Sequence, residues 1–275
     1  MHDVKEICKS VSNSELFADI PSGEIEEILC CARTLEFVSG DVIHSAGDPV
    51  TQVLLLMDGR IKKSQCSENG LEVVLRLGVP GEIISEPILW PRSRHSSTML
   101  ALQYCKVLAW GVANFTAIVE RFPAIQKNVE LILNSRLTEL SQRFCEVSTK
   151  ATSPRLAIGL IDLVDRIGER VDEHIELRVS QETLGQMTGM TLNSVWSLLS
   201  IWKGQGIVKL RRGTVEIHSL PHLLSCAELA RRDSQVLSKT TFANFLPSLR
   251  NCEEVRTGGS VSCTESKKSG TKAFQ

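Results

Sequence analysis

The chain has 275 residues, enough for two domains with separate cores, and a formal net charge of −1. No uncharged apolar run approaches about 18 residues, and the N-terminal stretch lacks the apolar segment of a signal peptide. These features exclude a membrane-spanning helix and predict a cytoplasmic protein. The net charge excludes a uniformly basic nucleic-acid binder, so any phosphate-binding surface must be a local basic patch.

Residues 15–110 have the pattern of a β domain. After a short helix over about 23–33, short apolar runs alternate with turn signals such as Gly40-Asp41, Gly47-Asp48 and Asp58-Gly59. Asn69-Gly70 between two such runs is a strong signal for a β-hairpin. Regular short strands separated by glycine turns predict an antiparallel barrel or jelly roll.

A long helix is predicted over 123–149, with Pro123 in its first turn. Its apolar residues follow the 4-3-4-3 spacing of a coiled-coil seam. We predict that this stripe is a homodimer interface; the alternative is a helix that packs on its own β domain. The predicted interface residues are Val129, Leu133, Leu137, Leu140 and Phe144, and Val147 continues the pattern.

Residues 151–154 are predicted to break this helix and form a hinge, and 155–167 to form a further amphipathic helix. The segment 179–213 then predicts two short helices, a tight turn and a basic β-hairpin. Gly189 lies at the turn, where a positive φ is needed, and Thr191 is placed to cap the second helix. This layout predicts a helix-turn-helix with a wing; the alternative is an ordinary corner between two helices.

The predicted DNA-binding surface has two parts. Residues expected to face base edges or begin the recognition helix are Thr191, Leu192, Asn193, Ser194 and Ser197. Residues expected to contact phosphate are Ser180, Gln181, Lys203, Arg211 and Arg212, with Lys209 nearby in the wing. Asparagine can read adenine and an apolar side chain can contact a thymine methyl, so A·T-rich sites or shape readout are expected.

The sequence has nine cysteines. An odd, scattered set without a CxxC pair or zinc-type spacing predicts reduced thiols, most of them small buried side chains, and no metal site. A redox-sensing role for one of them is the alternative. They are Cys8, Cys30, Cys31, Cys66, Cys105, Cys145, Cys226, Cys252 and Cys263.

The order of these segments resembles the catabolite activator/fumarate-nitrate regulator (CRP/FNR) superfamily of bacterial transcription factors. The resemblance covers about residues 12–225. It depends on G-D-x-I at 40–43, G-D at 47–48, the glycine at 59, P-G-E-x-x-x-E at 80–86, S-P-R-L-A at 153–157, and the helix-turn-helix. It implies an α+β protein with a cyclic-nucleotide-binding-like β jelly-roll barrel, a long dimerisation helix and a C-terminal winged helix-turn-helix. It also implies a homodimer that binds double-stranded DNA and contacts RNA polymerase.

The effector pocket departs from the family pattern. The members that bind cyclic AMP have a phosphate-binding cassette with glutamate on the ribose and arginine on the phosphate. Glu86 matches the glutamate, but Ser96 and Ser97 stand where the arginine-serine pair belongs, and Arg94 lies two residues upstream. The sequence therefore does not predict cyclic AMP binding.

Other cofactors receive little support. Relatives with an iron–sulfur cluster carry closely spaced N-terminal cysteines, whereas here only Cys8 lies in that region. His44 and His95 are the candidate haem ligands, and both are more simply explained as polar surface residues. The effector is therefore unknown.

The sequence predicts four parts: a sensor domain over 1–122, a dimerisation helix and hinge over 123–152, a DNA-binding domain over 153–232, and a disordered tail over 233–275. The predicted function is that of a homodimeric, sequence-specific transcription regulator, with no enzymatic activity, whose barrel senses a signal. The alternatives are an effector-independent regulator with a degenerate pocket and a cyclic-nucleotide-binding regulatory module that does not bind DNA.

Overall fold

The computed structural model describes residues 7, 8, 11, 14–85 and 93–234 of the chain. Residues Met1–Arg231 form one compact unit, and the second unit, Arg232–Gln275, lies almost entirely outside the described residues. The predicted tail over 233–275 therefore falls outside them, except for its first two residues, which end a helix.

The N-terminal half is the predicted antiparallel β domain. Its strands form a three-stranded sheet in the order β1-β7-β3 and a four-stranded sheet in the order β2-β6-β4-β5. The strands are β1 (Arg33–Phe37), β2 (Val42–His44), β3 (Gln52–Asp58), β4 (Ile61–Cys66), β5 (Glu72–Gly78), β6 (Thr98–Ala101) and β7 (Cys105–Gly111). The Asn69-Gly70 turn joins the antiparallel pair β4 and β5 as predicted, with Gly70 at a φ of +76°.

Strand β3 shows why this domain has nearly continuous apolar runs. Successive side chains of a strand point to opposite faces. Leu54 and Leu56 join a core with residues of β4, β6 and β7, whereas Val53 and Leu55 join a second core with the helices. Both faces of β3 are covered, so both sets of side chains are apolar.

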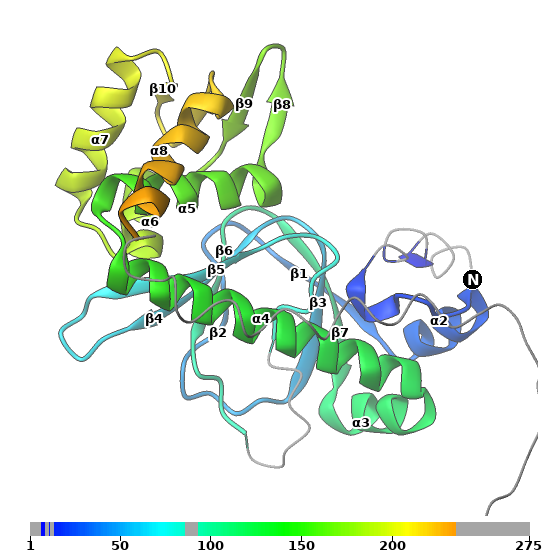
Figure 1. Cartoon of the computed structure of the whole chain (residues 1–275). Helices are drawn as coiled ribbons and strands as arrows, with labels where there is room; N and C mark the ends of the chain where they lie inside the picture. Colours follow the sequence, from blue (N-terminus) through cyan, green and yellow to red (C-terminus); the bar gives the residue numbers. More distant parts are fainter. Residues whose placement is uncertain (1–6, 9–10, 12–13, 86–92, 235–275) are drawn as a thin grey trace, which may run out of the picture. The chain divides into compact units, whose positions relative to one another are not determined.

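Helices cover one side of this domain. The short 3-10 helix η1 (Glu15–Phe17) and helices α2 (Ser22–Cys30), α3 (Val112–Arg121) and α4 (Pro123–Thr149) supply the second core. Helix α4, the long green helix of Figure 1, has the predicted bounds and contacts both η1 and α3. Its buried Asn128 donates hydrogen bonds to the carbonyls of Leu16 and Ala18, at 3.0 and 2.9 Å.

The second half of the chain combines helices with a small antiparallel sheet in the order β10-β11-β9-β8. Its elements are α5 (Thr152–Ile167), β8 (Glu169–Val171), β9 (His174–Leu177), α6 (Gln181–Thr188), α7 (Leu192–Gly204), β10 (Val208–Arg211), β11 (Thr214–Ile217) and α8 (Leu220–Ser234). The β8–β9 hairpin and helix α3 were not predicted. The predicted wing hairpin is confirmed as β10–β11, and helix α8 follows it.

The predicted hinge is shorter than expected. Only Lys150 and Ala151 separate α4 from α5, and Thr152, Ser153 and Pro154 already belong to the first turn of α5. The first N–H groups of a helix have no partner within the helix, so a proline there costs no hydrogen bond. The expectation that Pro154 stands outside the helix was therefore wrong.

The expectation that most cysteines are buried was also wrong. Of the seven cysteines in the described residues, only Cys8 and Cys105 are buried and Cys226 is half-buried. Cys30, Cys31, Cys66 and Cys145 are exposed, and Cys252 and Cys263 lie outside the described residues.

No helix among the described residues is long and apolar enough to cross a membrane.

Candidate functional site

Helices α6 and α7 form a tight helix-turn-helix whose ends are capped by side chains. The Ser180 hydroxyl accepts a hydrogen bond from the Thr183 backbone N–H at 3.0 Å, and the Thr191 hydroxyl accepts one from Ser194 at 3.2 Å. Gly189 ends α6 with a φ of +64°, as predicted. A Cβ on Gly185 would lie 2.7 Å from the Met190 carbonyl oxygen, so this close approach requires glycine.

Helix α7 has one buried and one exposed face. Its inner face buries Val195, Leu199 and Trp202 with Leu184 of α6 in one core. The predicted base-reading residues Leu192, Asn193 and Ser197 are exposed. Ser194 is half-buried, and its hydroxyl lies within hydrogen-bond distance of that of Thr191.

Trp196 is a surface residue that the sequence analysis missed. It is 59 % exposed, although tryptophan usually buries its large ring. Because residues four apart share a helix face, Trp196 lies on the same face as Leu192. This spacing could have revealed it in the sequence. The exposed indole enlarges the surface that α7 presents.

The basic residues of the β10–β11 wing differ in whether they form ion pairs. Arg211 forms an ion pair with Glu216 of β11, and the Lys209 Nζ lies 3.8 Å from Glu216 Oε2. Arg212 is exposed at the β10–β11 turn and makes no ion pair with any described residue. Lys203, near the end of α7, is exposed as well. Arg212 and Lys203 are therefore the cations most available to a phosphate backbone.

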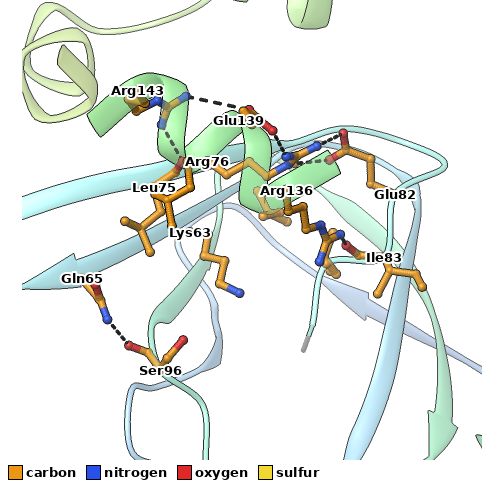
Figure 2. Close-up of a pocket in the computed structure, with 14 residues that line it drawn as sticks. Lys63, Gln65, Leu75, Arg76, Glu82, Ile83, Ser96, Arg136, Glu139 and Arg143 are labelled. Carbon is orange, nitrogen blue, oxygen red and sulfur yellow. Dashed lines mark hydrogen bonds and ion pairs between the residues drawn. The ribbon is translucent and has the colours of Figure 1, made fainter. Parts of the chain in front are cut away.

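A cavity of about 360 Å³ lies between β4, β5, the following loop and α4. Figure 2 shows Arg76, Glu139 and Arg143 along its α4 side, with Lys63 extending inward from β4. Apolar side chains from Ile61, Leu75, Ile83, Ile84 and Leu140 complete much of the lining. Four cationic side chains and two carboxylates line the cavity, namely Lys63, Arg76, Arg136, Arg143, Glu82 and Glu139.

Arg136 stands apart from the other cations of this cavity. Its guanidinium donates to the Ile83 carbonyl, and its buried Nε has no hydrogen-bond partner among the described residues. Burial and the nearby charge of Arg76 lower the pKa of Arg136. No carboxylate of the described residues pairs directly with this positive charge, so an anionic group would be stabilised beside it.

Glu82 is the centre of an ion-pair network beside the cavity. Its carboxylate lies 2.8 Å from Arg76 and 3.0 Å from Arg166 of α5. Burial alone would raise the pKa of Glu82, but its hydrogen bond and ion pair with Arg76 and the charge of Arg166 hold it below the ordinary value. The native structure therefore favours the ionised carboxylate.

The variant Glu82→Gln should reduce the free energy of unfolding at neutral pH by about 1–3 kcal/mol, the range for a buried charge-assisted hydrogen bond. Because the folded pKa is depressed, this contribution is complete above the ordinary glutamate pKa of about 4.3 and disappears as the pH falls through the folded value. Denaturant unfolding over a pH series should show the difference between the two proteins shrinking on acidification. Glu27→Gln, which removes an exposed pair with Arg121, is the control. A difference that stays constant with pH would contradict this assignment.

The structure does not bring the predicted pocket residues together in the cavity. Ser96 lines the cavity, and its carbonyl accepts a hydrogen bond from the Gln65 amide at 2.7 Å. Ser97 is completely buried and is not among the lining residues, and Glu86 lies outside the described residues. Arg94 donates to the Gly47 carbonyl at 2.6 Å. The cavity cations come instead from β4, β5 and α4.

The two candidate haem ligands are not surface residues, contrary to expectation. His44 and His95 are both buried, and their rings stack with centroids 3.5 Å apart. The stacked pair lies where β2 meets the segment before β6, and Gly47 and Asp48 exchange backbone hydrogen bonds with His95 there. Burial of these rings is thus explained by packing at the sheet edge.

The apolar stripe of α4 begins later than predicted. Val129 is only 7 % exposed and packs in the core of its own chain, so its assignment to a dimer interface was wrong. The later residues are exposed large apolar side chains: Leu133, Leu137, Leu140, Phe144 and Val147. Phe144 is the most open of them, at 72 % exposed. The first part of α4 therefore packs on its own domain, and the second part presents the stripe.

Comparison with known proteins supports both halves of this description. Residues 34–122 match the model of the cyclic nucleotide-binding domain, and residues 154–226 match that of the Crp-like helix-turn-helix domain. The fold and site thus define a DNA-binding transcription regulator with a cyclic-nucleotide-binding type β domain.

The chain belongs to the CRP/FNR family of transcription regulators. It is 24 % identical over 208 residues to the transcriptional regulatory protein btr of Bordetella pertussis, covering 74 % of this chain and 85 % of that protein. It is also 24 % identical over 208 residues to the cyclic AMP receptor protein of Thermus thermophilus, covering 75 % and 94 %. This is a family of transcription factors, so the prediction of a non-enzymatic protein is confirmed.

Solved structures share the fold. The c-di-GMP responsive global regulator CLP of Xanthomonas campestris aligns with a TM-score of 0.65 at 18 % identity, covering 72 % of this chain and 100 % of that one. A CRP/FNR-family transcriptional regulator of Thermus thermophilus aligns with a TM-score of 0.62 at 20 % identity, covering 71 % and 98 %.

Proposed function

We propose that the protein is a sequence-specific regulator that binds DNA as a homodimer, in the cytoplasm and in contact with RNA polymerase. The observation that carries this proposal is the capped helix α7, which presents Leu192, Asn193, Trp196 and Ser197 together on an exposed face. A recognition helix offers such residues to the major groove. We keep the predicted division into a sensor domain over 1–122, a dimerisation helix and hinge over 123–152, and a DNA-binding domain over 153–232.

The chemistry of the α7 surface indicates the kind of site. An asparagine amide can bond to both N6 and N7 of adenine, and leucine and tryptophan can contact a thymine methyl. Among Leu192, Asn193, Ser194, Trp196 and Ser197 there is no arginine to read guanine. We therefore expect A·T-rich half-sites. Ser180, Gln181, Lys203, Arg211 and Arg212 would contact phosphates around this helix.

The exposed stripe of α4 supports the dimer. Apolar side chains that recur every 3.5 residues bury themselves best against a second copy of the same helix. Two recognition helices then face two half-sites, as operator symmetry requires.

The cavity beside α4 supports an effector with an anionic group and an apolar body. Lys63 and Arg136 would interact with the anion, while Ile61, Ile84 and Leu140 would contact the apolar part. Because Arg136 and Leu140 belong to α4, a ligand in this cavity would contact the helix that carries the dimer stripe. This is the physical connection we propose between signal and DNA binding.

Arg212 should contribute to DNA binding through its charge, independently of the base sequence of the duplex. Replacing Arg212 with alanine should weaken binding to all duplexes alike and reduce the slope of log K against log salt by about 1 for each lost phosphate contact. Fluorescence titration of mixed-sequence duplex DNA at several salt concentrations measures this slope. Arg33→Ala, an exposed arginine of β1, is the matched control and should leave the slope unchanged. Equal slopes for wild type and Arg212→Ala would show that the wing does not contact phosphate through this residue.

A further inference from the structure

In the small sheet β10-β11-β9-β8, three side chains lie close to the fully buried carboxylate of Glu216. His174 and Glu176 lie on β9, Glu216 lies on the adjacent β11, and His218 follows β11. The pairing of β9 with β11 brings them together, because Glu176 stands opposite Glu216. The Glu216 side chain has no exposed area, and those of His174 and Glu176 are 14 % and 17 % exposed. Of the phosphate contacts proposed above, Arg211 borders this cluster through its ion pair with Glu216.

The His174 ring nitrogen Nε2 is the most informative atom of the cluster. It is buried and has no hydrogen-bond partner among the described residues. It lies 3.6 Å from Glu176 Oε1 and 3.9 Å from Glu216 Oε2, both too far for a hydrogen bond. A buried polar atom that faces two carboxylates without bonding to either requires an explanation.

We propose that His174, Glu176 and Glu216 form a binding site for a divalent transition-metal ion of the zinc class. One donor atom of each residue lies within 4.8 Å of the other two. Bonds of about 2.0–2.1 Å in a tetrahedral site separate neighbouring donors by about 3.3 Å, so small side-chain rotations would close the ligand set. One imidazole and two carboxylates suit zinc, whereas magnesium prefers an octahedral set of oxygen ligands.

The neighbouring groups fit this assignment. The His218 Nε2 lies 3.1 Å from Glu216 Oε2, and its ring stacks on His174 with centroids 5.0 Å apart. Such a contact would orient the Glu216 carboxylate, as outer hydrogen bonds do in metal sites. Arg211 and Lys209 now balance the charge of Glu216, and their side chains are 58 % and 55 % exposed. Both can turn toward solvent when an ion takes over that role.

Zinc binding to the full chain tests the proposal directly. Exposed thiols also bind zinc, so the protein is first alkylated with iodoacetamide and then titrated with Zn²⁺ against a chromophoric chelator. We expect one equivalent of Zn²⁺ per chain in the wild type, and a loss of that equivalent or at least tenfold weaker binding in His174→Ala and in Glu176→Gln. His222→Ala is the control, because this exposed histidine of α8 bonds to Ser219 and lies outside the cluster.

Two results would overturn the proposal. One is a wild-type protein that takes up no zinc after alkylation. The other is equal zinc uptake in the wild type, His174→Ala and Glu176→Gln, which would place the ion elsewhere. Circular dichroism of each variant confirms that it is folded, and Mg²⁺ at the same concentration should not compete with Zn²⁺ for the wild-type site.

Discussion

Replacing both Leu137 and Phe144 with glutamate should convert the protein to a monomer and reduce its affinity for a two-half-site duplex by at least a hundredfold. Both side chains are exposed in the single chain, at 63 % and 72 %, so the substitutions leave its own core intact. Neither lines the α4 cavity, whereas Leu140 does, which makes this pair the cleaner test. In a dimer, four carboxylates would be brought into an apolar seam and would have to lose their hydration. Light scattering and DNA titration measure the two effects.

The matched control is Leu131→Glu combined with Thr138→Glu. These two residues are also exposed and have the same spacing along α4, but they lie on another face of the helix. The control should remain dimeric and bind DNA as the wild type does. A dimer of unchanged mass in the Leu137/Phe144 variant would show that the stripe has another partner.

The second large effect is expected at Asn193. Replacing it with alanine should cost about 1–3 kcal/mol per half-site on the preferred duplex, because a bidentate contact to adenine would be lost. Affinity for unrelated duplexes, which depends on phosphate contacts, should change little. Competition titrations with the preferred and a scrambled duplex separate the two cases.

Asn134→Ala supplies the control for this variant. Asn134 is also an exposed helical asparagine, but it lies on α4. It should leave both affinities unchanged. An equal loss on preferred and scrambled duplexes in Asn193→Ala would mean that Asn193 contributes to binding without reading a base.

The sequence predicted elements well where local chemistry decides them. The bounds of α4, the positive φ of Gly189 and the Thr191 cap follow from a first-turn proline, a turn glycine and a short hydroxyl side chain. The Asn69-Gly70 hairpin belongs to the same group. Each of these signals depends on residues only a few positions apart, so it can be recognised in the sequence alone.

Tertiary packing decided the cases that the sequence analysis missed. Val129 has the spacing of the stripe, but the packing of α4 on η1 and α3 buries it. The hairpin β8–β9 has polar strands, and it forms because β9 pairs with β11 across the small sheet. Trp196 is different, because its position four residues after the exposed Leu192 is a local signal for the same helix face.

The cavity beside α4 could not be assembled from the sequence. Lys63 and Arg76 are opposite each other in the β4–β5 hairpin, but Arg136 lies much later in the chain and joins them only because α4 borders the same cavity. The family motif concerns position 96, which is serine in this chain, and it contains no information about cations from other elements. The same holds for His174 and Glu216, which meet through strand pairing.

Selection of binding sites from a pool of random duplexes by the wild-type protein tests the central claim most directly. A homodimer that reads DNA through α7 should enrich an inverted repeat with A·T-rich half-sites whose centres lie about one helical turn, or 10–10.5 base pairs, apart. A pool that shows no enriched sequence, or a single half-site without its symmetric partner, would contradict the account of a dimeric, sequence-specific regulator.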